Sequence, residues 1–106
     1  MKIGDLRHRI TIQQPIEIRN EVGEVIQSAW QDFTTVWAAI EPLRGREYFD
    51  AQQINAEVTS RIRIRYRPGI KPKMRVVYGE RIFDIQSVID VEERHKEIHL
   101  MCKEVI

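Results

Sequence analysis

The feature that most constrains this chain is a strict alternation of side-chain types over residues 58–67. Apolar or small residues alternate there with arginine: Val58, Ser60, Ile62, Ile64 and Tyr66 against Arg61, Arg63, Arg65 and Arg67. Successive side chains of a β-strand point to opposite faces, so the pattern predicts a strand with one buried face and one arginine face. We therefore expect a sheet protein that has to accommodate four neighbouring guanidinium groups.

Other segments hold alternating or clustered apolar and β-branched residues between turn residues, which predicts further short strands. These cover residues 6–12, 34–40, 74–78, 81–91 and a last strand in which Ile98, Leu100 and Cys102 are buried. Residues 16–18 and 25–26 are shorter extended stretches on either side of a turn. Pro15 is expected to close or interrupt the first strand, because proline lacks a backbone donor. Residues 20–24 are expected to form a hairpin turn, with Gly23 at a positive φ.

Residues 47–54 contain good helix formers and no glycine or proline, which predicts one short helix. About six short strands and one helix favour a mainly β fold, either a small antiparallel β-barrel or a sandwich, of which we predict the barrel. The helix then lies in a long loop between two strands. With 106 residues the chain is long enough for one core, so residues 1–106 are predicted to form a single domain.

No catalytic, cofactor-binding or metal-ligating constellation is found in the sequence. His8, His95 and His99 lack the spacing of metal ligands, and no glycine-rich phosphate loop is present. The single cysteine, Cys102, excludes a disulfide framework and alternates with buried positions, so we interpret it as a core thiol. No apolar run is long enough to span a membrane, and the first residues lack the apolar stretch of a secretion signal. We expect a soluble protein, made in the cytoplasm, that is not an enzyme.

Basic side chains are concentrated in one segment, although the net charge of the chain is small. The chain has a net charge of +1, which excludes a protein with a polyanionic terminal tail and a uniformly basic DNA condenser. Residues 61–75 carry seven basic and no acidic side chains, so the remainder has a charge of −6. Four arginines on one strand face cannot be buried unpaired; they face water, bind phosphate or pair with carboxylates of a neighbouring subunit. The sequence leaves all three possibilities open.

Aromatic side chains can belong either to the core or to an interface with a partner. Trp37 lies in an apolar segment and is predicted to belong to the core. Tyr48 and Phe49 are adjacent on the predicted helix, so at least one of them is expected to point away from the core, where it could contact a partner.

Several segments together resemble one protein family. They are Ile3-Gly4-Asp5-Leu6-Arg7-His8-Arg9-Ile10, Thr35-Val36-Trp37-Ala38-Ala39-Ile40, Gly45-Arg46-Glu47, Ile64-Arg65-Tyr66-Arg67, Gly79-Glu80-Arg81-Ile82-Phe83-Asp84-Ile85 and Leu100-Met101-Cys102-Lys103-Glu104. Their order resembles that of the head-tail joining proteins of tailed phages, also called head-tail adaptors or head-closure (stopper) proteins. The similarity spans essentially the whole chain, and the ordered set rather than any single motif carries it.

The resemblance implies a structural virion protein, encoded by a phage or a prophage, that has no catalytic activity. It implies a small β-barrel that assembles as a ring, expected to be dodecameric, beneath the portal and its adaptor. The ring closes the DNA-filled head and offers the surface where tail-completion or tail-tube proteins attach. The expected location is the virion neck, after synthesis in the bacterial cytoplasm, with packaged double-stranded DNA as a further partner and no contact with a membrane.

In related head-closure proteins the excursion between two strands reaches toward the central channel, and residues 43–57 correspond to it here. The channel-facing role is therefore carried over, as a hypothesis, to Arg44, Arg46, Glu47, Tyr48, Asp50, Gln52 and Gln53. The arginine strand, with Arg61, Arg63, Arg65 and Arg67, would brace neighbouring subunits or contact DNA. We expect the isolated chain to be mainly monomeric, with residues 43–57 mobile until the ring forms.

A nucleic-acid-binding small β-barrel is the alternative, with the arginine strand tracking phosphates. Single-strand binding of this kind uses aromatic rings interleaved with charges on one surface. Between residues 61 and 75 the one aromatic residue is Tyr66, and the alternation places it opposite the arginines. This reading therefore ranks second, and an enzyme or enzyme inhibitor ranks last.

Overall fold

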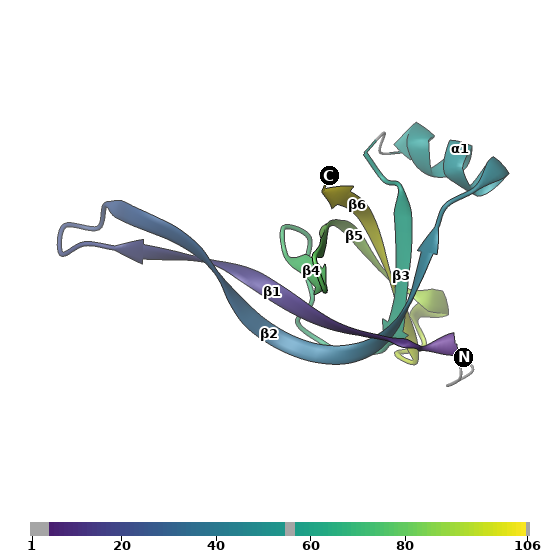
Figure 1. Cartoon of the computed structure of the whole chain (residues 1–106), viewed down its shortest axis with the longest axis horizontal. Coiled ribbons are helices and arrows are strands. Elements are labelled where there is room, and N and C mark those ends of the chain that lie inside the picture. The colour runs from purple at the N-terminus through teal and green to yellow at the C-terminus, as the bar shows by residue number, and fades with distance from the viewer. Residues whose placement is uncertain (1–4, 55–56, 106) are drawn as a thin grey trace.

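The computed structural model describes residues 5–54 and 57–105, and within them six antiparallel strands close into a barrel. The order around the barrel is β1-β2-β3-β6-β5-β4. The elements are β1 (His8–Arg19), β2 (Val25–Pro42), α1 (Gly45–Ile54), β3 (Ser60–Arg65), β4 (Arg75–Tyr78), β5 (Arg81–Asp90), the 3-10 turn η2 (Val91–Glu93) and β6 (Glu97–Val105) (Figure 1). The predicted mainly β barrel, with one short helix between two strands, is confirmed. Ile3 and Gly4 of the first family motif, and residues 55–56 of the 43–57 excursion, lie outside the described residues.

The interior of the barrel is filled by the inward face of every strand. Ile62 and Ile64 of β3 are fully buried, which confirms the face that the alternation predicted. They pack with Ile10, Ile12, Ala38, Val76, Phe83, Ile85, Ile98, Leu100 and Cys102. Cys102 is therefore a core thiol, as predicted. Tyr66 follows the end of β3 and is partly exposed, so the alternation ends with the strand.

The prediction that Trp37 belongs to the core is wrong, because its side chain is 50% exposed. Trp37 precedes Ala38, whose small side chain faces the barrel interior and is fully buried. Neighbouring positions of a strand face opposite ways, so Trp37 points outward. There the guanidinium of Arg9, its partner across β1 and β2, lies 5.4 Å from the centre of the indole ring.

A two-stranded hairpin extends far beyond the barrel, and we call residues 14–31 the hairpin arm (Figure 1). β4 pairs with β1 over residues 11–13, and β3 pairs with β2 from Ala38 onward, so the hairpin arm has neither neighbour. The expectation that Pro15 closes or interrupts the first strand is wrong, since β1 runs through it and Pro15 pairs with Trp30. Proline is tolerated there because one edge of the strand faces solvent and needs no donor.

The two ends of the hairpin arm are fixed by local interactions. At its tip the side-chain oxygen of Asn20 accepts hydrogen bonds from the backbone of Val22 and Glu24, and Gly23 has a φ of +87°, as the predicted turn requires. At its base the register shifts between Ile12 and Gln13, which leaves one extra residue on β2. Such bulges increase strand twist, and this one lies where the hairpin arm departs from the barrel.

Candidate functional site

Two of the four strand arginines are neutralised within the chain. Arg61 and Arg63 both donate through Nε to Oε1 of Glu41, over 3.1 and 2.9 Å. Arg61 also reaches Glu47 of α1 at 2.5 Å, and Arg63 reaches Glu97 of β6 at 3.3 Å. The exposed fractions of the two arginine side chains are 23% and 19%, so these are partly buried ion pairs.

Electrostatics within this cluster favour the charged forms. Partial burial lowers the pKa of Arg61, but hydrogen bonds and attraction from Glu47 and Glu41 outweigh it and raise the pKa overall. Burial also disfavours the charged form of Glu97 and so raises its pKa. Hydrogen bonds from His99 and Arg63 outweigh this effect and lower the pKa overall. Each group is thus held ionised by its partners, as in a stabilising network. The cluster fixes β2, β3, β6 and α1 relative to one another.

The other two arginines of the predicted strand lie in a different environment. Arg65 is the last residue of β3 and Arg67 lies beyond it, so the prediction that all four share one strand face is wrong for Arg67. Arg65 and Arg67 are exposed, and within the described residues Arg65 has no ion pair. Arg67 lies with its guanidinium 5.4 Å from the ring centre of Phe33. The arginine strand is therefore divided into a neutralised half near α1 and a free half at the opposite end.

Carboxylates of the same chain were not among the partners that the sequence suggested for these arginines. The reason is distance along the chain, since Glu41 lies twenty residues from Arg61 and Glu97 thirty-four from Arg63. The pairing of strands explains the contact: β2 and β3 are antiparallel neighbours, and Glu41 is the register partner of Arg61. Opposite charges placed directly across two strands are a stabilising pair. Without the pairing of β2 with β3, the sequence could not place them together.

The excursion between β2 and β3 stands outside the barrel wall, beside the ends of the strands that it connects (Figure 1). Its base is held by buried Leu43 and Val58 and by a 3.1 Å hydrogen bond from the Leu43 amide to the Thr59 carbonyl. Gln52 of α1 donates to the Val58 carbonyl at 2.6 Å. The helix itself is thus attached at few points.

The residues predicted to face a channel are brought together on and beside α1. Arg44 precedes the helix, and Arg46, Glu47, Tyr48, Asp50, Gln52 and Gln53 lie within it, all exposed except Gln52, which is partly buried. Arg46 and Asp50 form a loose pair one helical turn apart, at 3.9 Å. Phe49 is 68% exposed and meets the Tyr48 ring edge-on, with 5.9 Å between ring centres. The expectation that at least one of these two rings leaves the core is confirmed.

A hollow of about 540 Å³ lies beside the free half of the arginine strand. It is lined by Leu6, Thr35, Val36, Trp37, Arg65, Tyr66 and Arg67, and most of its lining is apolar. The sequence does not reveal this hollow, because its walls come from three separate segments that only barrel closure brings together. Exposed aromatic rings beside arginines are typical of protein interaction surfaces rather than of catalytic sites.

Within residues 5–54 and 57–105 no group of three or more histidine, cysteine, aspartate or glutamate side chains is arranged to hold a metal ion. Burial, with a smaller contribution from Asp84, raises the pKa of the Cys102 thiol far above its usual value. None of the helices in this described part is long and apolar enough to cross a membrane.

Comparison with known proteins decides what kind of molecule this is. A family model described as phage head completion protein matches residues 1–105. The chain belongs to the phage head completion protein family. It is thus a structural protein of the phage head-to-tail connection, and the nucleic-acid-binding alternative is not favoured.

One relative with the same description and two solved structures of the same fold match this chain. The head completion protein gp16 of Bacillus phage SPP1 is 34% identical over 73 residues, which cover 69% of this chain and 66%, just under two thirds, of gp16. The solution structure of protein SF1141 from Shigella flexneri 2a is 30% identical, covers 98% of this chain and 96% of its own, and superposes with a TM-score of 0.75. A chain from the virion of a native gene transfer agent particle shares the fold, with a TM-score of 0.63 and 20% identity, over 95% of this chain and 96% of its own.

Proposed function

We propose that this head completion protein assembles as a ring, dodecameric in the complete particle, at the virion neck. The ring binds the portal and its adaptor on one side, closes the DNA-filled head, and presents the other side to tail-completion or tail-tube proteins. The chain is made in the bacterial cytoplasm and joins the particle there. The observation that carries this proposal is the family match over residues 1–105 on a six-strand barrel.

In this ring, α1 faces the central channel. The helix stands clear of the barrel, its exposed face is mixed in charge, and Phe49 is uncovered. A mixed-charge helix has little net attraction for DNA phosphates. Repeated around a ring, however, each weak contact is multiplied by the number of copies. We propose that α1 narrows the channel and retains the packaged double-stranded DNA by obstruction rather than by strong binding.

The arginine strand divides between two roles in this proposal. Arg61 holds α1 through Glu47, and Arg61 and Arg63 both pair with Glu41 of β2, so they contribute little free charge for phosphate. Arg65 and Arg67 remain available to a neighbouring subunit. This distribution supports subunit contact over a continuous DNA-binding stripe, because a phosphate-tracking strand would keep all four guanidinium groups free.

The test is deletion of the gene from its phage or prophage, followed by lytic induction and electron microscopy. We expect free tails beside tailless heads that have lost DNA, and joined virions when the wild-type protein is supplied. Normal tailed particles without the protein would contradict the joining role.

A separate variant tests whether α1 retains the DNA in the channel. Tyr48→Ala/Phe49→Ala is expected to restore joining but to lower the fraction of heads that retain DNA. The matched control is Ile89→Ala, which removes a comparably exposed apolar side chain from β5. Equal DNA retention in both variants would contradict the role of α1.

A further inference from the structure

The tip of the hairpin arm is uncovered in a way that points to a partner. Val22 is 78% exposed, and Val25 and Ile26 beside it are also exposed. The carboxylates of Glu21 and Glu24 form no ion pair within the described residues, whereas Glu17 and Arg19 nearby neutralise each other at 2.6 Å. A two-stranded ribbon is at best marginally stable by itself, and no third strand of the described part of the chain pairs with the hairpin arm. The tip thus combines apolar side chains with two free negative charges.

The hollow has the complementary character. Its lining is largely apolar, with the rings of Trp37 and Tyr66 partly exposed. Arg65 and Arg67 lie on it, and no carboxylate of residues 5–54 or 57–105 forms an ion pair with either of them. An apolar, acidic tip and an apolar, cationic hollow match in both respects.

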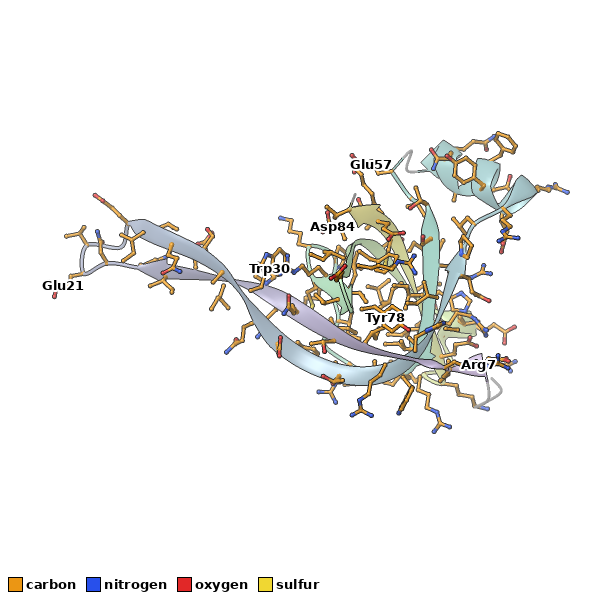
Figure 2. The ribbon with its side chains drawn as sticks, viewed as in Figure 1. Arg7, Glu21, Trp30, Glu57, Tyr78 and Asp84 are labelled. Atoms are coloured by element: carbon orange, nitrogen blue, oxygen red, sulfur yellow. The ribbon has the colours of Figure 1, made fainter. Side chains whose placement is uncertain are left out.

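One copy cannot bring these two surfaces together. Figure 2 shows Glu21 at the tip of the hairpin arm, at one end of the long axis, and Arg7, the neighbour of Leu6 in the hollow, at the other side of the barrel. The six residues from Gln14 to Arg19 extend about 20 Å at the rise of a β-strand. That reach covers much of a neighbouring barrel, since the molecule is 29 Å across its two shorter axes.

We propose that the tip of the hairpin arm of one copy inserts into the hollow of the next copy, with Glu21 and Glu24 facing Arg65 and Arg67. Such a contact joins two different surfaces, and repetition of it closes a ring when the rotation between copies fits. The inference rests on the proposed ring and names the contact that holds it. It also accounts for the uneven use of the four strand arginines.

Cysteine cross-linking in assembled particles tests the contact. Phage lacking the gene is complemented with Val22→Cys/Arg67→Cys, and joined particles are treated with a short bismaleimide and denatured. We expect a ladder of cross-linked multimers of this chain. Each single variant places a thiol on one side of the contact and is expected to stay monomeric, and the buried Cys102 adds no background. Val22→Cys/Thr35→Cys is a second pair, with an exposed position in the same hollow.

Three results would overturn the inference. Joined particles without cross-links in either pair would remove the contact and leave the joining function intact. Self-linking of Val22→Cys alone would indicate a symmetric tip-to-tip contact. A link from Val22→Cys to another virion protein would assign the hairpin arm to the adaptor or the tail. If wild-type complementation itself fails to join heads and tails, the proposed function fails instead, so the two failures are distinguishable.

Charge exchange gives an independent readout. In the Val22→Cys/Thr35→Cys background, which keeps both arginines, Glu21→Arg/Glu24→Arg and Arg65→Glu/Arg67→Glu are each expected to reduce the cross-link yield by about tenfold or more. Combining the four substitutions restores the opposite-charge arrangement and should recover the yield. Glu80→Arg/Glu93→Arg is the matched control, because both glutamates are exposed and lie outside the two surfaces. Equal yields in the control and the tip variant, or no recovery in the fourfold variant, would contradict the charge pairing.

Discussion

Replacing Gly69 with alanine perturbs the point where the hairpin arm leaves the barrel. Gly69 has a φ of +92°, and a Cβ on it would lie 2.8 Å from Cζ of Phe33. Phe33 is the extra residue of the β2 bulge at the base of the hairpin arm. The substitution therefore adds backbone strain and a steric clash to the folded state.

The size of the effect follows from these two contributions. A non-glycine residue at positive φ costs about 1–2 kcal/mol, and the restricted unfolded chain offsets about 0.4–1 kcal/mol of it. A contact that forces its neighbours to shift adds about 1–3 kcal/mol. We expect Gly69→Ala to lower the free energy of unfolding by about 1–4 kcal/mol. Gly23→Ala is the matched control: it has a similar φ of +87° but nothing within 4 Å of its Cβ, so it bears the strain alone.

Urea unfolding followed by tryptophan fluorescence measures both variants, and the difference between them isolates the clash. Phe33→Leu, which lacks Cζ, should reduce the cost of Gly69→Ala when the two are combined, as a double-mutant cycle would show. Thermal unfolding gives a second readout, at about 4–8 °C per kcal/mol for a domain of this size. The reasoning is refuted if Gly69→Ala costs no more than Gly23→Ala, or if Phe33→Leu leaves its cost unchanged.

Three further outcomes are expected. Cys102 should stay unmodified by maleimide in the folded protein and react after denaturation, because burial both shields the thiol and raises its pKa; mass spectrometry would reveal premature labelling. Arg81 lowers the pKa of Glu104, and His99 with Arg63 lowers that of Glu97, so both carboxylates stabilise the fold at neutral pH. That stabilisation should be lost as the pH falls below about 4.3, the pKa of a glutamate in the unfolded chain. The urea midpoint of Glu97→Gln/Glu104→Gln should therefore depend less on pH than that of the wild type. Glu41→Gln should lower the free energy of unfolding by about 1–2 kcal/mol, because two partly buried arginines lose a shared partner, whereas Glu80→Gln on the surface should change it little.

Much of the fold could be read from local patterns. The alternation around Ile62 and Ile64 identified the buried face of β3, and residues 20–24 formed the predicted hairpin turn. The helix was predicted at residues 47–54 and begins two residues earlier. These features depend on the period of side chains and on turn chemistry, both of which are written in neighbouring residues.

The candidate site could be read in part. Family resemblance pointed to the excursion and to the arginine strand, and the structure brings the excursion residues together at α1. The hollow and the hairpin arm could not be anticipated, because each depends on where one strand stops pairing with its neighbour. Pro15 illustrates this, since its effect on a strand depends on whether that strand has one neighbour or two.

The sequence by itself determined which side chains share a strand face, because the period of two is a property of the extended backbone. Tertiary structure decided what each face meets. Barrel closure placed Glu41 and Glu97 beside Arg61 and Arg63 and left Arg65 free, and it turned Trp37 outward by directing Ala38 into the core. The physical reason is that pairing register and strand neighbours arise from contacts between residues distant in the chain, which no local pattern specifies.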